Sequence, residues 1–592
     1  MQRKVLVMLG ACVWLTSLSW IGTAAEVEQE QEQERLERLF VEALRLLPEE
    51  NVPAEYRAQV AAVRPSRCAT FLAAEVREKF DRFSPQQQAV LTDALARPDL
   101  PLSVVSPSGR FRIHYATTGG DAVPPEDADG NGVPDFVDET VRAFENTHDL
   151  QVGQHGYREP PDDNGVDGPE YDVYIRDLRG FYGLTTAEGP VPGTPRNDQR
   201  SYIEIDNDFL DDHFTPGVRG AQVTAAHEYL HAIQFGYRLW QTNQEPFYYE
   251  LCSVWMEEVV YDDINDYYQY LPTFFRRTEI SFNHFDRFLH YLGEALWNLF
   301  LQKKYQNVAL FRRTWEIMES NVVAMDAINQ ALFEILGTTY ADEFAEFAIW
   351  NYFTGSRADS VNFYDEAAAY PEIKLNGDVS IDSDTTIVDS SLSSTHRYYR
   401  FTVFEGDGYL VNGGSDQPQN WKLGLVVTLP GGTVNVSIVD MSQGQNLGFL
   451  PRFSEIVVIP INTQVIDGPN IGRLTSTYSR FSFSLLRVPA DVGDEQGITA
   501  IYPNPFIVGR HGQLKVEFLP QNTERLEVRV LDAAGRVVKS DKLLGGSGAV
   551  TPTSFVWDGR DDAGKLVGSG IYLVQLSQDG FVQFKKFAVV RR

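Results

Sequence analysis

The spacing of hydrophobic and polar residues changes along this 592-residue chain, and the change divides it into regions. Up to about residue 360 most apolar stretches have helical spacing, whereas 110–115 and 202–206 alternate as half-buried strands do. From residue 373 onward, short alternating strands are separated by Gly, Ser, Asn and Asp turns, which is typical of β-sandwiches. We therefore predict a multidomain protein, with an α+β domain at 99–360 and two all-β domains at 373–490 and 499–592. The stretches with helical spacing are 34–98, 136–148, 221–234, 247–260, 289–305, 308–320 and 342–353.

The N-terminus has the pattern of a secretory signal. Arg3 and Lys4 precede an apolar stretch that ends at Ile21, and small residues follow at 23–25, so residues 1–25 are predicted to be a signal peptide. The alternative is a lipoprotein signal, with Cys12 as the cysteine of its lipoprotein box. Residues 26–98 are expected to form an acidic linker followed by a helical region, and the sequence does not decide whether this part is a propeptide. No later stretch is long and apolar enough to span a bilayer, so no transmembrane span is expected in the mature chain.

Charge and cysteine content limit the partners and the location. The net charge of −31 argues against nucleic acid as a partner, because phosphate binding requires a basic face. Cys12 would leave with the signal peptide, so Cys68 and Cys252 remain in an oxidising compartment. Two states are compatible with this pair: a disulfide bond between them, or two buried thiols.

The candidate chemistry lies in the sequence His-Glu-Tyr-Leu-His at 227–231. Residues i and i+4 share one face of a helix, so His227 and His231 can present both imidazoles to one metal ion. Glu250, nineteen positions after His231, is the predicted third ligand, which leaves a fourth position open as in catalytic zinc sites. Glu228 is then placed to accept a proton from water as the general base. Glu257 lies on the same helical face as Glu250 and is the predicted acceptor for a histidine N–H.

These segments resemble known families. His227 to His231 followed by Glu250 resembles the gluzincin clan of metallopeptidases, and HEYLHAIQFGY (227–237) with ELCSVWMEE (250–258) resembles a family of secreted bacterial metalloproteases. The likeness extends over roughly residues 65–360 and includes SGRFRIHYATTG, YDVYIRDL and FAIWNYFTGSR. It implies a zincin-like fold, a zinc ion (Zn²⁺) and hydrolysis of peptide bonds in a protein or peptide substrate.

The stretch that would grip a substrate N-terminus, as in aminopeptidases, is absent, so an endopeptidase is expected. Two alternatives remain open: a non-catalytic surface adhesin or scaffold on a peptidase-like fold, and another type of zinc hydrolase. A donor for the oxyanion is also required, and His284, His290 and Tyr291 are downstream candidates without a firm assignment.

A second metal site is predicted in DADGNGVPDFVDE (127–139), which also belongs to the resemblance. Acidic and amide residues occupy the ligand positions of an EF-hand-type loop, with Gly132 at the turn. We expect structural calcium (Ca²⁺) there, bound by Asp127, Asp129, Asn131, the Val133 carbonyl, Asp135 and Asp138.

The last region carries YPNPF (502–506), a D-x-x-G-R turn, WDGRDDAG (557–564) and SGIY (569–572). Together these resemble the C-terminal sorting domain of type IX secretion cargo and the related immunoglobulin-like domain of a flagellar hook-capping protein. The resemblance implies a bacterial protein that is secreted or attached to the outer-membrane surface, with the type IX secretion machinery as a partner. The preceding sandwich, 373–490, carries no cluster of ligand-type residues.

Overall fold

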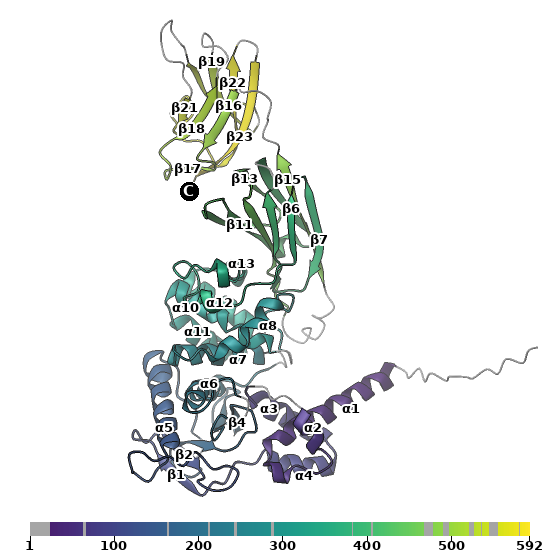
Figure 1. Ribbon diagram of the computed structural model, residues 1–592, viewed down its shortest axis with the longest axis vertical. Coiled ribbons are helices and arrows are strands. Elements are labelled where there is room, and N and C mark those ends of the chain that lie inside the picture. The colour runs from purple at the N-terminus through teal and green to yellow at the C-terminus, as the bar shows by residue number, and fades with distance from the viewer. Residues whose placement is uncertain are drawn as a thin grey trace, which may run out of the picture.

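The computed structural model describes residues 24–591 except for short internal gaps, and most of the predicted signal peptide lies outside the described residues. The described parts form a column: helices and a sheet at one end, a β-sandwich in the middle and a second β-domain at the other end (Figure 1). Among the described residues, no helix has the length and apolarity needed to cross a membrane. The gaps are 63–66, 163–164, 211–212, 242–244, 286–288, 382, 404–406, 467–477, 489–496, 520–525, 534, 544–553 and 579–580.

Four α-helices and short 3-10 turns form the described part of the N-terminal region. They surround a core of their own that includes Leu39, Phe40 and Leu91, and this core also takes in Phe181 and Leu184 from the neighbouring sheet domain. The acidic run that we expected to be a linker is helical, since it forms the first half of α1. The helices are α1 (Ala24–Ala43), α2 (Arg57–Ala62), α3 (Thr70–Glu78) and α4 (Pro85–Ala94).

A five-stranded sheet with the order β1-β2-β3-β5-β4 follows. The three central strands β2, β3 and β5 run parallel to one another. At the two edges of the sheet, β1 runs antiparallel to β2 and β4 runs antiparallel to β5. The edge strand β4 contacts helix α6, and α6 carries two of the candidate metal ligands. The strands are β1 (Leu102–Val105), β2 (Phe111–Tyr115), β3 (Tyr171–Ile175), β4 (Gly183–Pro190) and β5 (Gln199–Ile205).

The helices α5 (Asp135–His148), α6 (Val218–Tyr237) and α7 (Pro246–Val260) belong to one continuous hydrophobic core with the sheet. Helix α6 is buried along nearly its whole length because it packs against the sheet, α5 and α7. Smaller helices complete this part: α8 (Leu271–Arg276), α9 (His290–Gly293), α10 (Ala295–Tyr305), α11 (Ala309–Met318), α12 (Ala324–Leu336) and α13 (Tyr340–Trp350). The helical stretches predicted from the sequence do not include α12.

The middle domain is a sandwich of two antiparallel-rich sheets, ordered β13-β10-β15-β7 and β12-β11-β14-β9-β6, with β8 beside β14. It joins the helical part directly, because the Tyr398 hydroxyl donates to the Ala348 carbonyl of α13 at 2.8 Å. The strands are β6 (Gly377–Ile381), β7 (Thr385–Ser391), β8 (Thr395–His396), β9 (Tyr399–Val403), β10 (Asp407–Ser415), β11 (Trp421–Thr428), β12 (Val434–Asp440), β13 (Gln445–Leu450), β14 (Glu455–Asn462) and β15 (Ser479–Val488).

The C-terminal domain has two sheets, ordered β16-β18-β21 and β17-β23-β22-β19-β20, around a core that includes Trp557 and Phe587. An α+β region followed by all-β domains is therefore present, as the hydrophobic pattern predicted. The strands are β16 (Gly497–Tyr502), β17 (Phe506–Val508), β18 (Leu514–Leu519), β19 (Leu526–Asp532), β20 (Val537–Leu543), β21 (Ser554–Trp557), β22 (Gly570–Gln578) and β23 (Phe581–Arg591).

Candidate metal centre

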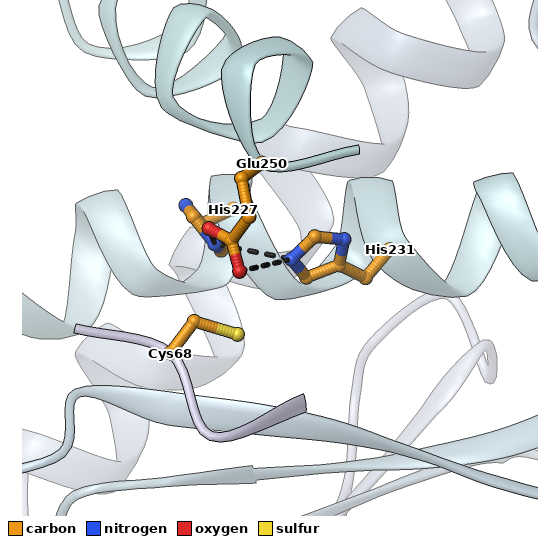
Figure 2. A group of neighbouring side chains, drawn as sticks. All are labelled: Cys68, His227, His231 and Glu250. Carbon is orange, nitrogen blue, oxygen red and sulfur yellow. Dashed lines mark hydrogen bonds and ion pairs between the residues drawn. The ribbon is translucent and has the colours of Figure 1, made fainter. Parts of the chain in front are cut away.

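Three acceptor groups converge between α6 and α7. His227 and His231 lie one turn apart on α6, and their Nε2 atoms are 3.2 Å from each other. Glu250 reaches down from α7, with one carboxylate oxygen 3.4 Å from His227 Nε2 and the other 3.8 Å from His231 Nε2. All three side chains are almost completely buried. Figure 2 shows both rings and the carboxylate directed toward one point.

Hydrogen bonds on the far side of each ring assign the imidazole tautomers. Gln234 Nε2 donates to the Tyr249 carbonyl at 3.0 Å, so its Oε1 is the atom that faces His231 Nδ1 at 2.8 Å. His231 Nδ1 therefore carries the hydrogen. The Glu257 carboxylate accepts in the same way from His227 Nδ1 at 2.7 Å. In the neutral rings both Nε2 atoms are left as lone-pair acceptors.

Two lone pairs and a carboxylate that face one another require a positive charge between them. Burial alone lowers the pKa of His227, but Glu250 and Glu257 outweigh burial and raise this pKa to about 9. Burial and the neighbouring His227 lower the pKa of His231 to about 4. A divalent metal satisfies all three acceptors together, and tetrahedral zinc sets two nitrogen ligands about 3.3 Å apart. The observed spacings fit that geometry.

Glu228 lies beside these groups with its carboxylate on the β4 side of α6. It accepts hydrogen bonds from the hydroxyls of Thr185 on β4 at 2.8 Å and of Thr70 at 3.3 Å. Burial raises the pKa of Glu228 above its ordinary value, and this shift brings a carboxylate closer to the range of an effective general base. Gly183 is required where β4 passes this side chain, because a Cβ at that position would lie 2.8 Å from Glu228 Cγ.

Cys68 is the fourth member of this cluster, which sequence reasoning did not place there. One ligand atom from each of Cys68, His227, His231 and Glu250 lies within 4.8 Å of the others. In Figure 2 the thiol projects toward the two histidines from the side opposite α7. Cys68 and Cys252 are both buried and are not joined by a disulfide. Of the two states left open, the structure has two thiols, because Cys252 faces Asn298 Nδ2 at 3.5 Å instead.

Neighbours of Cys68 also contact the site. Arg67 forms a buried ion pair with Glu257 at 3.0 Å and another with Asp266. Phe71 packs edge-on against the His231 ring, with 5.6 Å between centroids, and against Trp240 at 4.7 Å. Arg67 and Phe71 therefore border the candidate centre on either side of Cys68.

The candidates for an oxyanion donor lie at different places relative to the candidate metal ligands. His290 lines a small cavity with Glu294 and His396, and none of the four clustered residues lines that cavity. Tyr291 is buried and packs against Phe285 at 4.6 Å, which in turn packs against Phe71. Tyr291 is thus the candidate that lies nearer the centre through ring contacts.

The predicted calcium loop is folded around its acidic side chains. Carboxylate oxygens of Asp127, Asp129 and Asp135 lie within 4.8 Å of one another. Asn131 Nδ2 donates to Asp138 at 2.9 Å, and Asn131 Oδ1 accepts from the Val133 N–H at 2.7 Å. The loop therefore gathers its predicted side-chain ligands at the start of α5, where Asp135 is the first helical residue.

Several contributors had only weak signals in the sequence. Gln234 follows His231 at i+3, so its contact was available from helical spacing. Thr185, Thr70, Arg67 and Cys68 had no such signal, because each reaches the site from a segment far away in the sequence.

Comparison with known proteins identifies one domain. Residues 508–580 match the FlgD Ig-like domain family, so the C-terminal region contains an immunoglobulin-like domain. No curated protein matches the chain.

Solved structures give local matches. PorZ of Porphyromonas gingivalis, an essential bacterial surface component of its type-IX secretion system, is 20% identical over 18% of this chain and 14% of its own, with a TM-score of 0.14. Dimeric latent PorU from Porphyromonas gingivalis is 15% identical over 37% of this chain and 19% of its own, with a TM-score of 0.16. The chain thus spans less than a fifth of either protein. PliG of Aeromonas hydrophila, a periplasmic inhibitor of g-type lysozyme, is 12% identical over 19% of this chain and 96% of its own, with a TM-score of 0.14.

Proposed function

We propose that this protein is a secreted zinc-dependent metallopeptidase of zincin-like fold, and that it acts as an endopeptidase. The observation that carries the proposal is the convergence of His227 Nε2, His231 Nε2 and the Glu250 carboxylate, 3.2 to 3.8 Å apart in a buried site. When both imidazoles are neutral, their tautomers leave no donor among the three groups, so these groups can bind a cation.

The donor set favours zinc among the divalent metals. Two imidazoles and one carboxylate suit zinc, whereas calcium and magnesium prefer oxygen ligands alone. The outer hydrogen bonds from Glu257 and Gln234 hold each ring in the tautomer that a metal requires. When bound, zinc supplies the positive charge that polarises a substrate carbonyl and makes a neighbouring water more acidic.

Glu228 is the residue that handles the proton in this proposal. Its carboxylate is adjacent to the ligand set on the same helix, and its two hydrogen bonds to threonine hydroxyls orient it without neutralising it. It accepts the proton of the attacking water and passes it to the leaving amine. The buried position, 1% exposed, keeps bulk water from competing for that proton.

The edge strand β4 is the proposed binding site for the substrate. One side of β4 pairs with β5, and among the residues that the structure describes no strand of this sheet lies on the other side. Main-chain hydrogen bonds along such an edge bind an extended peptide without regard to its side chains. Thr185 of β4 contacts Glu228, so a peptide on this edge passes the base.

A digest of a proteome-derived peptide library by the zinc-loaded protein, before and after limited proteolysis, tests the activity. We expect cleavage at internal peptide bonds. The Glu228→Gln variant should keep one zinc per chain and lose about 10²- to 10⁴-fold in rate, as loss of a general base does. Equal rates for the two proteins would contradict the mechanism, and an absence of stoichiometric zinc in both would contradict the site.

The C-terminal domain supports a proposal about location. We infer that residues 499–592 direct the protein to the type IX machinery for secretion or surface attachment, and the Ig-like match at 508–580 is what supports this. Deleting 499–592 in a host with that machinery should leave an active enzyme in the periplasm. Finding the truncated protein in the medium or on the surface would show that the domain has no sorting role.

A further inference from the structure

Residues 67–71 connect the N-terminal helices to the metal centre. We propose that Cys68 Sγ is a fourth ligand of the metal, and that segment 67–71 thereby keeps the peptidase latent until the N-terminal region is released. The inference rests on the proposed function, since it requires a metal on His227, His231 and Glu250.

The position of the thiol is the first argument. Cys68 Sγ belongs to the four-atom group within 4.8 Å, and only 7% of the residue is exposed. The Thr70 N–H donates to this sulfur at 3.4 Å, which fixes the position of the thiol beside the two histidines. Thiolate is among the preferred donors of zinc, and a fourth protein ligand closes the position that a catalytic site keeps open for water. The thiol proton leaves to solvent when the metal binds, and the sulfur lone pair forms the new bond.

Pairing along the sheet edge is the second argument. Cys68 forms a parallel bridge with Gly183 at the start of β4. The Ala69 N–H donates to the Gly183 carbonyl at 3.0 Å, and the Tyr182 N–H donates to the Arg67 carbonyl at 2.8 Å. The segment thus lies on the edge where we place the substrate, and it uses the same main-chain groups that a bound peptide would use.

The side chains that flank Cys68 occupy the remaining parts of the site. The Thr70 hydroxyl accepts from the Thr185 N–H at 2.8 Å and donates to Glu228, so the general base is already engaged. Phe71 covers His231 and contacts Trp240 and Phe285. Water and substrate are therefore both kept out by one short segment.

The N-terminal region is built so that it can separate from the enzyme. Most of its buried apolar side chains pack in a core separate from the main core of the sheet domain, although Phe181 and Leu184 of that domain join the N-terminal core and Phe71 joins the main one. Residues 95–101 join it to β1 without regular structure, and Ala96, Asp99 and Pro101 are exposed. Hydrolysis of one peptide bond in this connector would remove the covalent link between the segment and the chain that carries the proposed zinc ligands, so that the segment can dissociate.

Cobalt(II) in place of zinc tests the ligand directly, because a thiolate bound to cobalt gives a charge-transfer absorption band that nitrogen and oxygen ligands lack. The test compares the full chain, Cys68→Ala and the matched control Cys252→Ala, which removes the other buried thiol. A fourth protein carries a site for a specific protease between Pro98 and Asp99. Each is measured for cobalt stoichiometry, for the band and for hydrolysis of the peptide library, with circular dichroism to verify folding.

We expect the band in the full chain and in Cys252→Ala, and its loss in Cys68→Ala and after cleavage at the inserted site. Hydrolysis should rise roughly tenfold or more in the cleaved protein, because a tethered ligand competes at an effective concentration in the millimolar range. One equivalent of cobalt without the band in the full chain would overturn the ligand assignment. A band with no rise in hydrolysis in either Cys68→Ala or the cleaved protein would overturn latency. Failure of the full chain to bind cobalt would instead refute the metal site itself.

Discussion

The Glu257 carboxylate accepts a hydrogen bond from His227 Nδ1 at 2.7 Å, and it also pairs with Arg67 at 3.0 Å. One carboxylate thus fixes the orientation of a proposed zinc ligand and is itself tied to the N-terminal region. Because the hydrogen bond strengthens the imidazole as an electron-pair donor, Glu257 would act on the proposed metal through His227.

The first prediction follows from this pair. Glu257→Gln should weaken zinc binding by about 10- to 100-fold, the usual effect of losing such an outer partner. Competition titration with a chelator measures the affinity. Glu258→Gln is the matched control, because burial raises the pKa of Glu258 to about 9 and its carboxyl is already neutral at pH 7. Equal affinities for the two variants would show that Glu257 does not support the metal site.

The second prediction concerns the close approach of β4 to α6. A Cβ on Gly183 would lie 2.8 Å from both Glu228 Cγ and Thr224 Cγ2, so Gly183→Ala must displace the strand or the helix. We expect a loss of about 1–3 kcal/mol in the free energy of unfolding. Thermal unfolding of Gly120→Ala provides the control, since its added Cβ meets nothing within 4 Å. An unchanged melting temperature for Gly183→Ala would contradict the packing described for this edge.

The third prediction concerns the loop at 127–138. Calcium should raise the melting temperature of the wild type, because a ligand that binds only the native state stabilises it by about 2.7 kcal/mol at 100 times its Kd. Asp127→Ala should abolish this response and leave zinc content unchanged. Glu139→Gln, one position outside the ligand register, should respond to calcium as the wild type does. If chelators do not affect the wild type, the loop is an ordinary acidic turn.

The fourth prediction is a pH dependence at the junction between α13 and the sandwich. His396 packs against Phe344, and burial, with Arg397 nearby, lowers the pKa of His396 from 6.5 to about 3. The pKa of His290, which lines the same cavity, is also lowered to about 3. Between pH 6.5 and about 3 the unfolded chain binds a proton at each position and the folded chain does not. Stability is therefore lost as the pH falls through this window, by about 1.4 kcal/mol per pH unit for each histidine.

Denaturant unfolding at several pH values between 6.5 and 4 measures this slope. His396→Gln should make the transition of the sandwich less sensitive to pH, whereas His511→Gln, in the C-terminal domain, should leave that transition as it is. A slope that His396→Gln does not change would mean that other groups cause the acid sensitivity.

Much of the candidate metal site could be predicted from the sequence because its geometry is local. His227 and His231 share a helical face at any position in a fold, and Glu250 and Glu257 share the next helix at i and i+7. The calcium loop is local in the same sense, since all its side chains lie within twelve residues. Alternation of apolar residues was likewise enough to place the two all-β domains.

Only the tertiary structure showed which residues outside α6 and α7 lie against the candidate ligands. The acidic run at 26–34 became helix because the apolar face that continues it, with Leu36, Leu39 and Phe40, is buried in the N-terminal core. Cys68 carried two equally compatible interpretations in the sequence, and its pairing with Gly183 on the edge of β4 places its thiol beside His227, His231 and Glu250. Pairing at a strand edge joins distant segments of the chain through main-chain groups. Because nearly every residue has these groups, the pattern of side chains in the sequence does not predict such pairing.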